Sequence, residues 1–197
     1  MSLGRADLVA ALERIAAAME RDFAELNELD GQLGDGDLGV TMTRGMRAVI
    51  ELKDTLSDDL GMALLACAQA FTKSSGSSYG TLMATGLMAA AKTLKGRTNV
   101  APDELSGLIA DARDKMQARG KAELGGKTVL DSLDALAAAL SEEPTPAAAK
   151  RAVAQALEDF RDKPATVGRA RIFAEKSQGM DDPGMLAMER IITAASA

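Results

Sequence analysis

Three aspartates lie within eight residues in the segment LDGQLGDGDLGV, which covers residues 29–40. Three carboxylates this close repel one another unless a cation lies among them. The intervening glycines allow a turn that brings Asp30, Asp35 and Asp37 toward a common point, and carboxylate oxygens are ligands for Mg²⁺ or Ca²⁺ rather than for a soft metal. The segment therefore predicts a metal site, and a solvated acidic turn without a metal is the alternative.

The spacing of these residues excludes an EF-hand. Counting from Asp35 puts Gly39, Val40 and Met46 where that loop needs Asp or Asn, Gly and Glu. Three carboxylates also leave a pair of Mg²⁺ ions with open coordination places, which Mg²⁺ fills with water and phosphate oxygens. The missing ligand is therefore predicted to be a polyphosphate.

Glycine and serine are concentrated in four further segments, KSSGSSYGT, RGKAELGGKT, TVGRAR and QGMDDPG. The first precedes a predicted helix, so its amides and hydroxyls can meet an anion, although such residues are also ordinary helix caps. The second is not a P-loop, because five residues separate Gly120 from Gly126 where that motif has four, and no strand precedes it.

Basic side chains in these segments are the candidates for phosphate neutralisation. Arg169 and Arg171 follow Gly168 and either contact phosphate oxygens or form surface salt bridges. Lys121 and Lys127 are candidates for phosphate contacts, but the favoured prediction is that both are solvated surface lysines.

The composition excludes several kinds of chemistry. The 197 residues contain no histidine, so the chain offers no Ser-His-Asp triad, histidine zinc site or phosphohistidine. The net charge of −6 argues against a nucleic acid or an anionic membrane as partner. The lone Cys67 cannot form an internal disulfide, and the sequence shows no signal-peptide or membrane-span pattern, so a cytoplasmic location is predicted.

The elements that position these segments are predicted to be helices. Apolar residues recur every three or four positions, which predicts eight helices and no strand. The apolar runs cover 8–26, 42–50, 62–70, 79–94, 105–116, 130–140, 153–160 and 185–195, and the seventh helix begins near Thr145. Short connections make successive helices antiparallel, which predicts one up-and-down all-α domain with every glycine-rich segment at one end. The periodicity leaves open whether the helices close into a ring or stack in layers.

Taken together, ELDGQLGDGDLGVTMTRGM, SSGSSYGT, ARGKAELGGKTVLD, GRA and DPG resemble the nucleotide-binding L subunit of dihydroxyacetone kinase, a domain also found fused in ATP-dependent dihydroxyacetone kinases. The resemblance covers nearly all of residues 1–197. It implies a single domain that forms an eight-helix up-and-down antiparallel barrel, with nucleotide bound in the loops at one end.

The resemblance also implies the ligands. Asp30, Asp35 and Asp37 would hold two Mg²⁺ ions that bridge the phosphates of ADP or ATP, and Arg169 would stabilise charge during phosphoryl transfer. The implied nucleotide contacts are Leu38, Gly39, Thr41, Ser74, Ser75, Gly120, Val129, Arg169, Asp182, Pro183 and Gly184. Leu38 and Thr41 depart from the family, which commonly has histidine and asparagine there.

The resemblance implies, finally, a partner. In the family a separate K subunit holds the substrate through one of its own histidines, so this chain is predicted to be half of an enzyme. The donor is either free ATP or a phosphotransferase-system protein that rephosphorylates bound ADP. The alternatives are a paralogue that acts on another hydroxyketone such as a tetrulose, and a nucleotide-binding regulator without catalysis.

Overall fold

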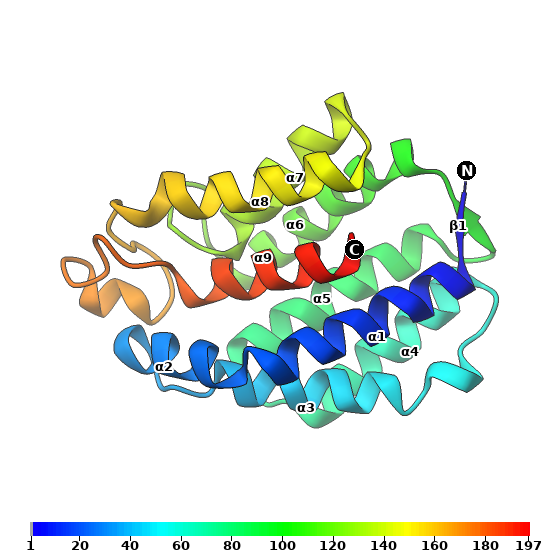
Figure 1. Cartoon of the computed structure of the whole chain (residues 1–197), viewed down its shortest axis with the longest axis horizontal. Helices are drawn as coiled ribbons and strands as arrows, with labels where there is room; N and C mark the ends of the chain where they lie inside the picture. The colour runs from blue at the N-terminus through cyan, green and yellow to red at the C-terminus, as the bar shows by residue number, and fades with distance from the viewer. Residues whose placement is uncertain (1) are drawn as a thin grey trace.

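Nine α-helices make up most of residues 2–197, the part of the chain that the computed structural model describes (Figure 1). They are α1 (Arg5–Arg21), α2 (Phe23–Leu33), α3 (Leu38–Ile50), α4 (Leu60–Ser74), α5 (Ser78–Thr93), α6 (Leu105–Gly120), α7 (Val129–Glu142), α8 (Pro146–Arg161) and α9 (Pro183–Ala195). Short 3₁₀ turns lie at η1 (Lys53–Thr55), η2 (Pro102–Glu104) and η3 (Ala170–Phe173). A two-residue strand β1 (Leu3–Gly4) pairs antiparallel with β2 (Asn99–Val100).

The helices close into a ring. Each of α3 to α9 packs against the next in chain order, and α1 completes the ring by packing against both α3 and α9. The sequence left this point open, and the structure confirms the all-α barrel that the family resemblance implied. Within the described residues, no helix combines the length and the apolar character needed to cross a bilayer.

Small and aliphatic side chains fill the interior, because the chain has few aromatic residues. The largest buried cluster joins α1, α3, α4 and α9 and includes Met19, Met42, Phe71 and Met185, each at most 2% exposed. Cys67 lies in the same cluster, where burial raises the pKa of its thiol to about 11. This cysteine is therefore a core residue and not a reactive thiol.

One predicted helix is two helices in the structure. The apolar pattern runs without interruption over 8–26, but the helix breaks at Asp22, and the chain resumes as α2. The start of α3 lies so close to this break that a Cβ at Gly39 would be 2.3 Å from the carbonyl oxygen of Phe23. Because α2 continues to Leu33, Asp30 belongs to the last turn of this helix and not to the loop in which the sequence placed it. The prediction of no strand was also wrong, because the two-residue strands β1 and β2 pair with each other.

Candidate metal and phosphate site

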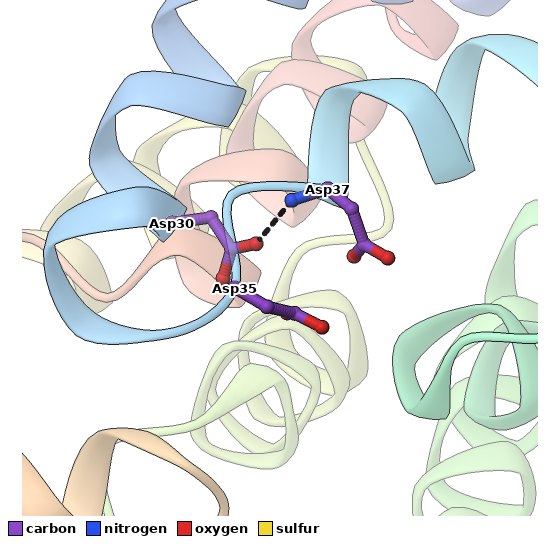
Figure 2. A group of neighbouring side chains, drawn as sticks. All are labelled: Asp30, Asp35 and Asp37. Atoms are coloured by element: carbon purple, nitrogen blue, oxygen red, sulfur yellow. Dashed lines mark hydrogen bonds between the residues drawn. The ribbon is translucent and has the colours of Figure 1, made fainter.

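The acidic cluster forms where α2 ends and α3 begins (Figure 2). Asp30, Asp35 and Asp37 each offer a carboxylate oxygen, and these oxygens lie within 4.8 Å of one another. Figure 2 shows the hydrogen bond between the Asp30 carboxylate and the backbone N–H of Asp37. Asp30 Oδ2 accepts this bond (2.9 Å) and a second one from the backbone N–H of Leu38 (3.2 Å). Asp30 therefore folds the turn, and Asp35 and Asp37 are exposed at its surface.

Glycine is required inside this turn. A Cβ at Gly34 would lie 2.6 Å from Asp30 Oδ1, and Gly36 has a φ of +75°. Both positions demand a residue without a side chain, because one is crowded and the other lies in the left-handed region. The glycines are thus part of the geometry that brings the three carboxylates together.

The electrostatics of the cluster favour a cation. Burial raises the pKa of Asp30, the two backbone hydrogen bonds lower it, and the charges of Asp35 and Asp37 raise it further. A hard divalent cation would remove this repulsion, and an all-oxygen ligand set suits Mg²⁺. The residues present therefore fit the metal that the sequence predicts.

Arg169 reaches the cluster from the long connection between α8 and α9 and forms an ion pair with Asp35. Both side chains are exposed, so this pair adds little to the stability of the fold. Its value is positional, because it shows that a guanidinium reaches the carboxylates. Arg171, the second candidate, forms none of the ion pairs found among residues 2–197.

The connection between α4 and α5 places three serines at the same end. Ser74 Oγ donates to Phe71 O (3.0 Å), and Ser75 Oγ accepts from the N–H of Ser77 (3.3 Å). Ser77, whose hydroxyl the sequence offered either as an anion contact or as a helix cap, caps α5 by accepting from the N–H of Gly80 (3.0 Å).

The start of α9 is tied to the start of α5. Tyr79 Oη donates to Gly184 O (3.0 Å), and a Cβ at Gly184 would lie 2.9 Å from the Tyr79 ring. Asp182 caps α9 by accepting from the N–H of Met185 (2.9 Å). Burial raises the pKa of the Asp182 carboxyl to about 7. The sequence pointed to the Asp182-Pro183-Gly184 turn but gave no sign of Tyr79 beneath it.

Several of the implied nucleotide contacts have little side-chain surface to offer. Leu38 and Thr41 are each 5% exposed, and Val129 is 3% exposed. Any contact from these positions must come mainly from the backbone. Gly120, the last residue of α6, is exposed.

Lys127 corrects a prediction. The sequence indicated a solvated surface lysine, but the side chain is 1% exposed. Its Nζ donates to three backbone carbonyl oxygens of residues 34 to 50 positions away. Partners so distant in sequence leave no local signal.

The four connections at this end touch one another. Arg169 joins the α8–α9 connection to the α2–α3 turn, Tyr79 joins the start of α5 to that of α9, and the N–H of Thr166 donates to Gly126 O (3.2 Å) in the α6–α7 connection. The fold and site thus define a closed helical barrel with an acidic, oxygen-ligand cluster and a facing arginine at one end.

Comparison with known proteins gives the family. The profile of the DAK2 domain matches residues 32–197, and the chain belongs to this family. The ADP-binding subunit DhaL of the PEP-dependent dihydroxyacetone kinase of Escherichia coli is 30% identical over 99% of both chains. L-erythrulose 1-kinase of Mycolicibacterium smegmatis is also 30% identical, over 95% of this chain but only 34% of its own length.

A solved structure has the same fold. The dihydroxyacetone kinase of C. freundii, crystallised with AMP-PNP and Mg²⁺, superposes with a TM-score of 0.77 at 24% identity. The match covers all of this chain and 34% of that protein. The chain therefore corresponds to one part of that larger kinase.

Proposed function

We propose that this chain is the ADP- or ATP-binding phosphotransfer subunit of a two-component dihydroxyacetone-type kinase, with residues 1–197 acting as one nucleotide-binding domain. The observation that carries the proposal is the cluster of Asp30, Asp35 and Asp37 with Arg169 facing it. It occurs in a chain that matches an ADP-binding kinase subunit over nearly its full length. The family relationship supports the assignment to the kinases, a class of transferases.

In the proposed site, Asp30, Asp35 and Asp37 hold Mg²⁺, with two ions as the family resemblance implies. When bound, these ions would neutralise the terminal phosphates of the nucleotide. The backbone N–H groups that donate to Asp30 fix the turn before any ligand arrives, so the carboxylates need little rearrangement.

Arg169 is the proposed catalytic residue. Its guanidinium already lies at the carboxylates, where a phosphate would provide a second anionic partner. A planar guanidinium suits the charge that spreads over phosphate oxygens in an in-line transfer.

The remaining proposed contacts surround this centre. Exposed Gly120 and the half-buried Ser74 and Ser75 are accessible to the nucleotide, as is the turn at Asp182 and Gly184. The buried Leu38, Gly39, Thr41, Val129 and Pro183 are proposed to contribute through the backbone or by shaping the pocket wall.

The proposed partner is a K subunit that carries a small ketose. The chain has no histidine of its own to hold such a substrate covalently. A phosphotransferase-system protein is the proposed phosphoryl donor, because the Lactococcus lactis relative is named PTS-dependent, and free ATP is the alternative donor. A protein donor would rephosphorylate ADP that stays bound to the chain.

A second candidate is a kinase subunit for a tetrulose. A relative named L-erythrulose 1-kinase supports it, at the same identity as the dihydroxyacetone kinase relative. The choice between the two substrates rests with the partner that binds the ketose.

The test is to denature the purified protein, separate the released nucleotide by chromatography, and repeat after prolonged EDTA treatment. We expect stoichiometric ADP from the untreated sample and little from the treated one. A protein that releases no nucleotide and binds neither ADP nor ATP when Mg²⁺ is added would contradict the proposal. A protein that retains ADP but transfers no phosphoryl group after K subunits are added would instead be a nucleotide-binding regulator.

A further inference from the structure

Lys127 is a buried ammonium that the proposed chemistry does not use. Its Nζ donates to the carbonyl oxygens of Arg161 (2.7 Å), Lys163 (2.9 Å) and Ser177 (2.6 Å). An ammonium has three N–H donors, so all of them are occupied. Because the side chain is also only 1% exposed, a direct contact with phosphate is excluded.

The backbone at this position indicates that the side chain is needed. Lys127 has a φ of +61°, in the left-handed region that favours glycine or asparagine. Burial of its charge also lowers the pKa of Lys127, against the opposing attraction of Asp182, Asp181 and Asp162. The backbone conformation and the burial of charge both oppose a lysine here, and its three hydrogen bonds offset these costs.

The three carbonyls belong to the two ends of one segment. Arg161 and Lys163 lie where α8 gives way to the long connection, and Ser177 lies near the far end of that connection. Ser177 reinforces the closure, since its Oγ accepts from the N–H of Ala165 (2.8 Å) and donates to Ala174 O (2.6 Å). Lys127 thus holds the two ends of the connection between α8 and α9 together, so that the connection forms a closed loop. We call the place where Lys127 contacts Arg161, Lys163 and Ser177 the neck of this loop.

Lys127 is itself held firmly. Asp131, in the first turn of α7, accepts from the N–H of Gly125 (2.5 Å) and of Thr128 (2.7 Å). These two bonds flank Lys127 on both sides and fix its backbone to the barrel. The neck of the loop is therefore anchored to a helix of the ring.

Arg169 lies near the middle of this loop, and its side chain is exposed. Two contacts join this part of the loop to the end of α2: Ala170, the next residue, lies in a small apolar cluster with Leu33, and Lys176 Nζ donates to Gln32 O (2.8 Å). The direction in which the loop presents Arg169 therefore depends on these contacts together with the closure of its two ends by Lys127.

We propose that Lys127 is a positioning residue for nucleotide binding, which closes the 162–182 loop through three backbone carbonyls and thereby presents Arg169 to the phosphates held at the acidic cluster. This inference rests on the proposed function, because it assigns Lys127 a role at that site.

The test is a double-mutant cycle between Lys127→Met and Arg169→Met, read as the affinity for Mg–ADP by titration calorimetry. Lys127→Met keeps the length of the side chain and removes the ammonium. We expect it to weaken Mg–ADP binding by about tenfold to a hundredfold in the otherwise unchanged protein. In the Arg169→Met background it should weaken binding by less than about threefold, since the group that it positions is already gone.

Lys163→Met is the matched control. It removes one lysine charge from the same loop, but its Nζ lies over the Phe160 ring, 3.7 Å from the ring centroid, and donates none of the hydrogen bonds found in the described residues. We expect the affinity for Mg–ADP to stay within about twofold of the unchanged protein. A loss as large as that of Lys127→Met would mean that the charge of the loop matters and not its closure, which overturns the inference.

Two further results overturn the inference. One is equal losses from Lys127→Met in both backgrounds, which would mark a general structural effect. The other is an unchanged affinity in a folded Lys127→Met protein. If that variant does not unfold cooperatively, Ser177→Ala replaces it in the cycle, with the same expected coupling to Arg169→Met and the same contradicting outcomes. Failure of the unchanged protein to bind Mg–ADP would instead contradict the proposed function.

Discussion

The two ends of the barrel are both made of connections between antiparallel helices, but they differ in backbone conformation and in polarity. Seven residues of the described chain have a positive φ. Six lie at the site end, namely Gly36, Lys121, Gly125, Lys127, Gly168 and Gly179, and only Gly96 lies at the other end. Unusual backbone conformations are thus concentrated where the acidic cluster is.

The opposite end is built from ordinary stabilising devices. Asp59 and Thr145 cap their helices, and Arg97 forms two hydrogen bonds with Glu104 (2.6 and 2.8 Å). An apolar cavity of about 720 Å³ extends from this end into the barrel, lined by residues such as Leu94, Leu105 and Leu136. The difference indicates that residues at one end mainly stabilise the ring, whereas residues at the other end mainly form the site. Mutations at the two ends should therefore affect different properties, namely the free energy of unfolding and the affinity for Mg–ADP.

The largest effect is expected from Asp35→Asn at the acidic cluster. It removes one metal ligand and the partner of Arg169, so we expect the affinity for Mg–ADP to fall by about a hundredfold or more. The melting temperature without ligand should hardly change, because the ion pair that is lost is exposed. Asp54→Asn, an exposed aspartate near the opposite end, is the control for charge. If the two variants bound Mg–ADP with equal affinity, the acidic cluster would not be the metal site, and the two ends would not differ in this respect.

The second effect separates the ring from the site. Leu136 is 1% exposed and borders the apolar cavity, so Leu136→Ala enlarges a space that the helices cannot easily fill. We expect a loss of about 3 kcal/mol in the free energy of unfolding, measured by urea denaturation. The affinity for Mg–ADP at a temperature well below the transition should stay within about twofold. A parallel loss of binding would show that the two ends are coupled.

The third effect concerns pH and the cap of α9. The pKa of Asp182 rises from 3.8 to about 7 on folding, so the folded state keeps a proton that the unfolded state releases. The free energy of unfolding should therefore fall as the pH rises between these values. Lys127 attracts the ionised form and Asp131 repels it.

Asp182→Asn keeps an oxygen for the cap and removes the ionisation. Relative to the unchanged protein, its free energy of unfolding should improve by on the order of 1 kcal/mol between about pH 5 and pH 8. Urea titrations at the two pH values measure this. The same change with pH in both proteins would show that Asp182 does not titrate in this range.

The smallest effects come from a matched pair of glycines. Gly168 at the site end and Gly96 at the other both have positive φ, and a Cβ at either would meet no atom within 4 Å. Gly168→Ala and Gly96→Ala should each cost about 1 kcal/mol of folding free energy through backbone strain alone. Only Gly168→Ala, next to Arg169, should also weaken Mg–ADP binding. If both variants bound Mg–ADP more weakly, or if neither did, the backbone conformation at Gly168 would have no specific role in nucleotide binding.

Much of the fold was predictable because its signals are local. The three-and-four spacing of apolar residues placed the helices, and the seventh predicted helix begins near Thr145, which caps α8 in the structure. The break at Asp22 was not predictable, because the apolar stripe continues through it. The start of α3 packs against this break at Gly39 and Phe23, which is a contact between different helices that no local pattern reports.

The candidate site was predictable to a similar degree. Asp30, Asp35 and Asp37 lie close in sequence, so their spacing alone indicated a shared cation, and the structure brings their oxygens together. The roles of the individual nucleotide contacts stay predictions. Lys127 was misjudged, because a lysine in a glycine-rich polar segment is usually solvated and its acceptors lie in another connection.

The sequence by itself determined the all-α class, the antiparallel order of the helices and the acidic turn, since each depends on residues within a few positions of one another. Only the tertiary structure decided that the ring closes through α1 and α9, that Arg169 faces Asp35, and that Lys127 is buried. These features join residues that are far apart along the chain. They depend on which surfaces of the helices pack together, and this is a property of the whole chain rather than of any single segment.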